Sequence, residues 1–233
     1  MRKFLINQAL YSAFLLFFSC DLLASKRFLT HDSELFQLVD PIVGKLIETE
    51  FSALKKKKIK IKYYLIESET VYLASNFGGS RVFLGTPVYH IGLNKKLLDE
   101  TLSYNGLRAI LVHELSHTLD YASGSTLGKI LPIGVQVLTH KGRIQYERKT
   151  DLKTVLRGYG QGLIEFKLWQ YPQLEQKQLR IKKAEYLTPK EVKWIIENSF
   201  DFDHPLIKKW FKKKIPSDFI QFKNAHASYL GQL

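Results

Sequence analysis

Cysteine is almost absent from this chain of 233 residues, which contains only Cys20. A single cysteine cannot form a disulfide within the chain, so the fold has to be stable without that cross-link. Internal repeats and low-complexity linkers are also absent. We therefore predict one compact domain behind an N-terminal appendage, because the length matches a single domain that buries a sizeable core.

Acidic residues are scarce relative to basic ones, with 22 Asp and Glu against 35 Lys and Arg and a formal net charge of +13. Such a surplus suits nucleic acid, an anionic membrane or a solubilising surface. The tight run Lys55 to Lys58 leads into alternating residues typical of a strand with one solvated face. Since no motif for reading nucleic acid accompanies the charge, we predict no nucleic-acid partner.

The N-terminal apolar stretch, residues 9–18, is too short for a transmembrane helix. It follows Arg2 and Lys3, and no further charge occurs before Asp21. A basic start followed by a short apolar core is typical of a secretory signal. We predict that residues 1–25 are a signal peptide and residues 26–233 an exported, extracytoplasmic domain. In a bacterium this domain would be periplasmic or a membrane-anchored lipoprotein.

Cys20 ends a segment, Leu16 to Cys20, that resembles a bacterial lipobox, although Phe17 stands where leucine is usual. A lipid on Cys20 would attach the protein to a membrane. Cleavage near Ala24 or Ser25 would instead release it. The sequence leaves both processing routes open.

Hydrophobic spacing predicts an α+β fold with a small sheet followed by a mostly helical C-terminal half. Strands are expected at residues 58–63, 71–74, 81–84 and 88–91, with a turn at 78–79. Helices are expected from an N-cap and first-turn proline at Asp40-Pro41, after a break at Asn105-Gly106, near Arg143, and from the capping box at Thr188. Gly124 is the expected end of the second of these helices.

The sequence His113-Glu114-Leu115-Ser116-His117 lies within the second predicted helix. An α-helix has about 3.6 residues per turn, so both imidazoles lie on one face and can bind one metal ion. Zinc suits neutral imidazole ligands, and Glu114 could take a proton from a zinc-bound water. Burying these groups without a partner costs free energy, which favours a metal site over a chance match.

A catalytic zinc site needs a third protein ligand and one open position. The metzincin arrangement is excluded, because Asp120 and Ser123 stand where that class carries glycine and histidine. Glu147, on the next predicted helix and four residues before Asp151, is the better candidate. Their spacing places both carboxylates on one face.

With these residues the chain resembles the gluzincins, and most closely the M48 peptidases, in which HExxH precedes a Glu-xxx-Asp pair on a later helix. The resemblance covers about residues 70 to 160 and implies a zincin-like fold, with an edge strand packed on the active-site helix. It implies that Glu147 is the third zinc ligand and that Asp151 supports a ligand histidine. The segment from Asn76 to Leu84 is similar to the turn and edge strand that precede the metal helix. Further transmembrane helices or a longer insertion, usual in M48 peptidases, do not occur in this chain.

Two features of the site remain open in the sequence. Asp151 could itself be the third ligand, as in aspartate-type zincins, with Glu147 on the helix surface. An oxyanion donor is also expected for a peptidase, and the candidates by proximity are Tyr159, His140 and Arg157. His90, on a predicted edge strand, could line the substrate cleft.

The leading hypothesis is a peptidase with one Zn2+ ion, in which Glu114 activates water for attack on a peptide carbonyl. A peptide or protein substrate would add to the strand near Val82 to Leu84 by edge pairing. The alternative is an exported metal-binding or degenerate protease-like module that binds a partner. Membrane attachment in either case would depend on a lipid on Cys20.

Overall fold

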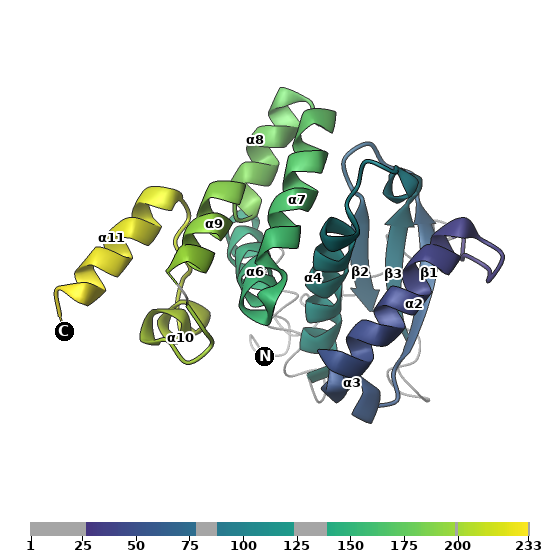
Figure 1. The fold of residues 1–233 in the computed structure, drawn as a ribbon, viewed down its shortest axis with the longest axis horizontal. Helices are drawn as coiled ribbons and strands as arrows, with labels where there is room; N and C mark the ends of the chain where they lie inside the picture. The colour runs from purple at the N-terminus through teal and green to yellow at the C-terminus, as the bar shows by residue number, and fades with distance from the viewer. Residues whose placement is uncertain (1–26, 78–87, 124–138, 199, 233) are drawn as a thin grey trace, which may run out of the picture.

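The computed structural model describes residues 27–77, 88–123, 139–198 and 200–232 (Figure 1). The fold is α+β, as the hydrophobic spacing predicts. The strands are β1 (Lys60–Ile66), β2 (Leu73–Phe77) and β3 (Val88–Asn94). The α-helices are α2 (Glu34–Thr49), α3 (Ser52–Lys56), α4 (Tyr104–Ser123), α6 (His140–Thr154), α7 (Gly160–Gln170), α8 (Gln176–Glu185), α9 (Pro189–Glu197), α10 (Pro205–Lys212) and α11 (Phe219–Leu230). Short helical turns are η2 (Lys95–Leu98), the π-turn η3 (Val155–Tyr159) and η4 (Tyr171–Gln173).

Several predictions concern residues outside the described ranges. They are the signal peptide with Cys20, the turn at 78–79, the strand at 81–84 and the helix stop at Gly124. Within the described residues, no helix is long and apolar enough to span a membrane.

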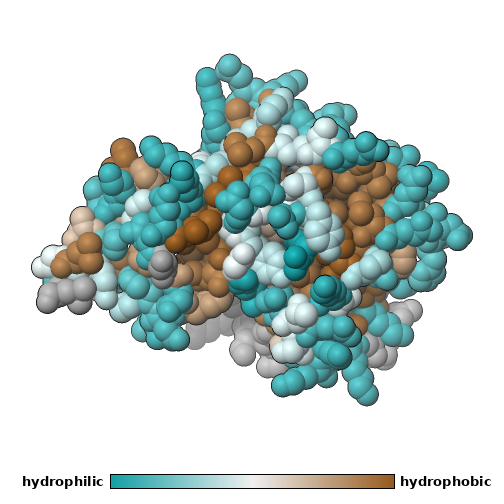
Figure 2. All heavy atoms as spheres, in the orientation of Figure 1, coloured by the Kyte–Doolittle hydropathy of each residue, from teal (hydrophilic) through white to brown (hydrophobic). Residues whose placement is uncertain are grey.

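The described sheet has the strand order β1-β3-β2, with β1 parallel and β2 antiparallel to β3. The strands predicted at 58–63, 71–74 and 88–91 are confirmed as β1, β2 and β3. The first two begin two residues later than predicted, at Lys60 and Leu73, and all three extend further than predicted. The lysines of β1, Lys60 and Lys62, are exposed, whereas the alternation ends at Tyr63 and Tyr64, which are both buried. Lys55 to Lys58 are exposed as well, and hydrophilic side chains cover much of the face in Figure 2.

Helix α4 lies between the sheet and the pair α6 and α7 (Figure 1). On the sheet side its apolar residues join those of α2 and the strands in one core, which includes Leu46, Ile91, Leu93, Leu111 and Leu115. Because α4 is covered on both sides, side chains from its middle turns are removed from water. This position sets the environment of the HExxH motif.

The predicted start of the first helix at Asp40-Pro41 is wrong. Helix α2 begins at Glu34 after the N-cap Ser33, and Pro41 lies inside it. An internal proline costs about 3 kcal/mol. The apolar stripe extends upstream through Leu35 and Val39, however, and burial of such side chains contributes roughly 1.5–3 kcal/mol each, which outweighs the cost.

The predicted break at Asn105-Gly106 is also wrong, because α4 begins at Tyr104 and contains both residues. A Cβ at Gly106 would lie 3.2 Å from the backbone nitrogen of Phe166, and one at Gly162 only 2.3 Å from the carbonyl oxygen of Asn105. These glycines allow α4 and α7 to approach closely. The pattern that suggested a turn therefore marks a helix contact.

The C-terminal helices form a second apolar cluster, to which α4 contributes Ala109. The capping box predicted at Thr188 is confirmed, and its Glu191 also pairs with Arg148 at 2.7 Å. Arg148 is fully buried and donates further hydrogen bonds to the carbonyl oxygens of Tyr186 and Pro216. Arg148 thus connects α6 to α9 and to the backbone at Tyr186 and Pro216.

Candidate metal centre

The HExxH residues occupy the buried middle of α4. The rings of His113 and His117 lie edge-to-face with centroids 4.7 Å apart, and their side chains are only 3% and 7% exposed. The intervening and preceding apolar residues, such as Leu111 and Leu115, point into the core. Helical spacing therefore places both imidazoles on one face inside the protein, as predicted.

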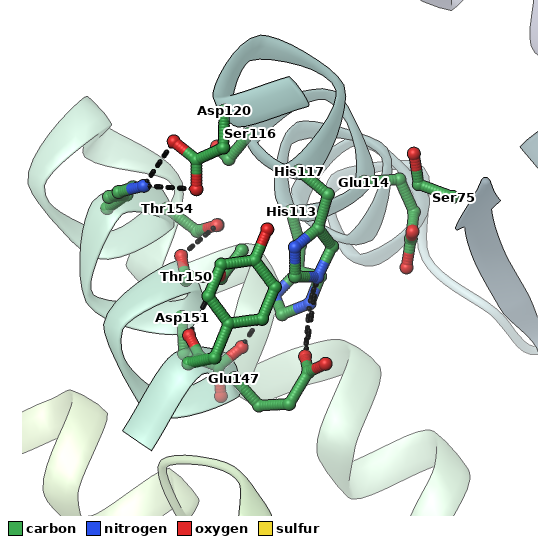
Figure 3. Close-up of polar contacts among 12 residues, drawn as sticks. Ser75, His113, Glu114, Ser116, His117, Asp120, Glu147, Thr150, Asp151 and Thr154 are labelled. Atoms are coloured by element: carbon green, nitrogen blue, oxygen red, sulfur yellow. Dashed lines mark hydrogen bonds and ion pairs between the residues drawn. The ribbon is translucent and has the colours of Figure 1, made fainter. Parts of the chain in front are cut away.

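Glu147 reaches the same point from α6 (Figure 3). Its Oε2 atom lies 3.2 Å from Nε2 of His113 and 3.3 Å from Nε2 of His117, and these nitrogens are 3.0 Å apart. Ligand atoms bound to tetrahedral zinc at about 2.0–2.1 Å lie roughly 3.3 Å from one another. The three donor atoms are therefore spaced almost as three corners of such a site.

Asp151 lies one turn further along α6 and contacts the other nitrogen of His113. Its Oδ1 atom is 2.9 Å from Nδ1 of His113, while Oδ2 accepts hydrogen bonds from Nζ of Lys167 and the backbone N–H of Leu187. A carboxylate on Nδ1 holds the proton there and leaves Nε2 free for a metal. Glu147, and not Asp151, therefore faces both Nε2 atoms.

His117 is held mainly by aromatic neighbours. The ring of Tyr146 lies 4.9 Å away between centroids, and that of Tyr121 stacks at 6.5 Å. Its Nδ1 atom is buried and has no hydrogen-bond partner among the described residues. Ring packing thus orients His117, whereas a carboxylate orients His113.

Charge within the cluster favours the ionised forms of its members. Burial lowers the pKa of His113, but hydrogen bonds to Asp151 and Glu147 outweigh it and raise this pKa to about 10. Burial raises the pKa of Glu147, yet the adjacent histidines more than offset this and hold it well below its usual range. A cation that binds between these atoms therefore competes with a proton.

Glu114 points from α4 toward β2, away from Glu147 (Figure 3). Its carboxylate accepts a hydrogen bond from the backbone N–H of Ser75, and burial raises its pKa. The hydroxyl of Ser75 lies 3.0 Å from that of Thr118, which joins β2 to the helix a second time. Glu114 is therefore held next to β2 and is not one of the three converging donor residues, which are His113, His117 and Glu147.

The donor set suits a metal ion. Two imidazoles and one carboxylate are ordinary zinc ligands, and three protein ligands leave one coordination position open. Among the described residues, His113, His117 and Glu147 form a group whose donor atoms all lie within 4.8 Å of one another. These donor types also occur in sites for other transition metals, so the group could hold a metal ion but is not specific to zinc.

Tyr159, predicted as a candidate oxyanion donor, contacts a different pair of residues. Its hydroxyl oxygen lies 3.2 Å from Nη2 of Arg108 and 3.3 Å from Oε1 of Glu50. The preceding glycine, Gly158, has a φ of 87° and turns the chain between α6 and α7. Tyr159 therefore serves the junction of α2, α4 and η3.

The other two oxyanion candidates also have partners of their own. His140 is 66% exposed at the start of α6, with Nδ1 3.9 Å from Oε1 of Glu185. The guanidinium of Arg157 lies 4.7 Å from the centroid of the Phe51 ring. No contact in the described part of the chain joins either residue to the histidine pair.

His90 lies on β3, which is the central strand of the described sheet and not an edge strand as predicted. It is in register with Lys62 on one side and Asn76 on the other. The sequence pattern showed a strand here, but strand order depends on long-range pairing that local residues do not reveal.

A pocket beside His113 and Glu114 contains residues to which the sequence pattern assigned no role. These residues are Lys167, Lys182 and Tyr186, which line the pocket together with Asp151. The local signal is Lys167, which lies at helical spacing from Leu163 and Gln170 and is buried with them. Tyr186 follows α8, and its ring centroid lies 5.9 Å from that of His113.

No protein-family model matches the chain, and comparisons with curated proteins and with solved structures give no match.

Proposed function

We propose that this protein is an exported zinc-dependent hydrolase, and specifically a metallopeptidase of the gluzincin type. The observation that carries the proposal is the convergence of Nε2 of His113, Nε2 of His117 and Oε2 of Glu147, with mutual distances of 3.0 to 3.3 Å. Buried Glu114 beside these donors adds a proton acceptor. A metal ion held by such ligands and a nearby base can together activate water for hydrolysis.

In this proposal each residue has a separate task. Bound by His113, His117 and Glu147, a zinc ion would supply Lewis acidity toward an attacking water and the scissile carbonyl. Glu114 accepts a proton from that water and passes it to the leaving amine. Asp151 keeps the proton of His113 on Nδ1, and Lys167 compensates the charge of Asp151.

Peptide as the substrate is supported by the resemblance to M48 peptidases. HExxH is followed by Glu147 and Asp151 in the order of that family, and the two carboxylates contact opposite nitrogens of His113. Nothing in the donor set alone distinguishes a peptide carbonyl from another carbonyl. The proposed substrate class therefore depends on the resemblance, and the proposed metal chemistry depends on the site.

Metal content and hydrolysis test the proposal together. The purified chain should bind one zinc ion, and Glu147→Gln should lose most of it, as measured by mass spectrometry of the metal. Glu114→Gln should retain zinc but lose hydrolysis of a peptide library. The matched control is Glu197→Gln, which changes an exposed residue of α9 and should alter neither property. Hydrolysis by the Glu114→Gln variant would overturn the assignment, and zinc binding without any hydrolysis would favour the partner-binding module.

Export and lipid attachment are proposed from residues 1–25 alone. Expression of the full chain in a bacterium should give a processed protein outside the cytoplasm. Cys20→Ser separates the two processing routes, because it should release the protein from the membrane fraction only if Cys20 carries a lipid. An unprocessed cytoplasmic product would contradict the signal peptide.

A further inference from the structure

The pocket beside the metal centre extends to a second set of residues on α7 and α8. His113, Glu114 and Asp151 line one part of it, while Lys167, Lys182 and Tyr186 line another. A group bound in this pocket would lie next to both the metal ligand and the proposed proton acceptor. Its charged side chains are therefore in a position to select what the centre acts on.

Most charges in the pocket already have partners. Asp151 accepts hydrogen bonds from Lys167 and from Leu187 in addition to its contact with His113. The ammonium of Lys167 lies 3.0 Å from that carboxylate, and its side chain is only 5% exposed. These two groups neutralise one another and leave no charge to recognise a ligand.

Lys182 differs from Lys167 in this respect. No carboxylate of the described residues lies within ion-pair distance of its ammonium, and its close partner is the ring of Tyr186, 5.0 Å from Nζ to the centroid. Nearby Glu185 is occupied by Arg143, whose Nε and Nη2 atoms donate to it at 3.0 and 2.6 Å. Burial lowers the pKa of Lys182, and the charges of Glu185, Glu147 and Glu114 offset this only in part. A partly buried cation without an anionic partner costs free energy that an incoming carboxylate recovers.

We propose that Lys182 is a specificity-determining residue that binds a carboxylate of the substrate, so that the centre prefers peptides that present a carboxylate to this pocket. This inference rests on the proposed function, because it assigns the pocket to the same hydrolytic site. The carboxylate can belong to a Glu or Asp side chain or to the C-terminus of a peptide. Both present the same chemistry to the ammonium, and the experiment distinguishes them.

The probes are pools of decapeptides of mixed sequence in which one position is fixed as Glu, Gln or Lys. Each pool is made with a free C-terminal carboxylate and with a C-terminal amide. Hydrolysis by the zinc-loaded protein is measured by mass spectrometry. Binding without turnover is measured separately, as retention of each pool by the zinc-loaded Glu114→Gln protein in equilibrium dialysis.

The wild-type protein should favour a carboxylate by roughly tenfold, as expected for a charge-assisted hydrogen bond. A preference for the Glu pools in both terminal forms indicates a side-chain carboxylate, and a preference for free over amidated termini indicates the C-terminus. Lys182→Met should abolish the preference in hydrolysis and in retention, whereas Lys182→Arg should keep most of it. The matched control is Lys177→Met on the exposed side of α8, which should leave the preference unchanged.

The failures of the two proposals are separable. Hydrolysis that depends on Glu114 but shows no carboxylate preference, or keeps its preference in Lys182→Met, overturns the role of Lys182 and leaves the peptidase intact. If no hydrolysis depends on Glu114, the peptidase proposal is overturned. In that case retention decides the role of Lys182 alone, because loss of Glu-pool retention in the Glu114→Gln/Lys182→Met protein supports carboxylate binding and unchanged retention rejects it. Unfolding curves of each variant confirm that the fold is kept.

Discussion

His113 and Asp151 are joined by a contact of 2.9 Å between Nδ1 and Oδ1, which connects the candidate metal centre on α4 to α6. The second oxygen of the same carboxylate accepts hydrogen bonds from Lys167 on α7 and from Leu187 between α8 and α9. One buried side chain thus connects four segments of the chain. Changes at this position should affect metal binding and stability together.

Asp151→Asn should weaken zinc binding by about 10- to 100-fold, because an amide no longer stabilises the ligand form of His113. It should also lower the free energy of unfolding, since Lys167 is left buried without its counter-charge. Zinc affinity is measured against a competing chelator and stability by urea denaturation. The control is Asp120→Asn, a residue of α4 that pairs with Lys153 at the partly exposed side of the helix. Equal zinc affinity in the two variants would contradict the role assigned to Asp151.

Zinc binding at pH 7 should release a proton, because the pKa of His113 is raised to about 10 by Asp151 and Glu147 despite its burial. Calorimetry in buffers of different ionisation enthalpy measures the release. The same shift makes a stability prediction for the metal-free protein. Because the pKa of His113 is higher in the folded than in the unfolded protein, its protonation stabilises the fold. This contribution is fully present at a pH below about 6.5, the pKa of an unfolded histidine, and is lost as the pH rises toward 10. His113→Gln should remove the dependence of the free energy of unfolding on pH between about 6.5 and 10. An unchanged dependence in this variant would contradict the raised pKa of His113.

Arg148→Met should destabilise the fold by about 3–5 kcal/mol, because it leaves the buried carboxylate of Glu191 without its counter-charge. The carbonyl oxygens of Tyr186 and Pro216 lose their donors as well. Urea denaturation measures the effect. Lys193→Met, at an exposed position of α9, is the matched control and should change stability by no more than about 0.5 kcal/mol.

Gly162→Ala and Gly44→Ala should have opposite effects on stability. A Cβ at Gly162 would lie 2.3 Å from the carbonyl oxygen of Asn105, so α4 and α7 must separate at a cost of typically about 1–3 kcal/mol. At Gly44 nothing lies within 4 Å, and alanine in the middle of α2 should add roughly 0.5–1 kcal/mol. Thermal unfolding of both variants tests the pair. A stabilised Gly162→Ala protein would contradict the close helix contact.

Elements with a strong local signal were predicted well. The capping box at Thr188 and the strands around Lys62 and Ile91 occur where the residue pattern indicates them. The predictions based on Pro41 and Gly106 are wrong, because packing overrides the local preference of each residue for a helix start or a chain break. Burial of the α2 stripe outweighs the cost of its proline, and the approach of α7 makes use of the glycine in α4.

The sequence by itself determined the chemistry that α4 can offer. Residues four apart on a helix share a face whatever surrounds them, so His113 and His117 were paired, and Glu147 was placed on one face with Asp151. Only the tertiary structure decided which carboxylate meets the two Nε2 atoms, since that choice depends on how α6 crosses α4. It also decided that Lys182, distant in the sequence, lines the pocket beside the HExxH helix. Local periodicity fixes the face on which a side chain lies, but only long-range packing fixes what faces it.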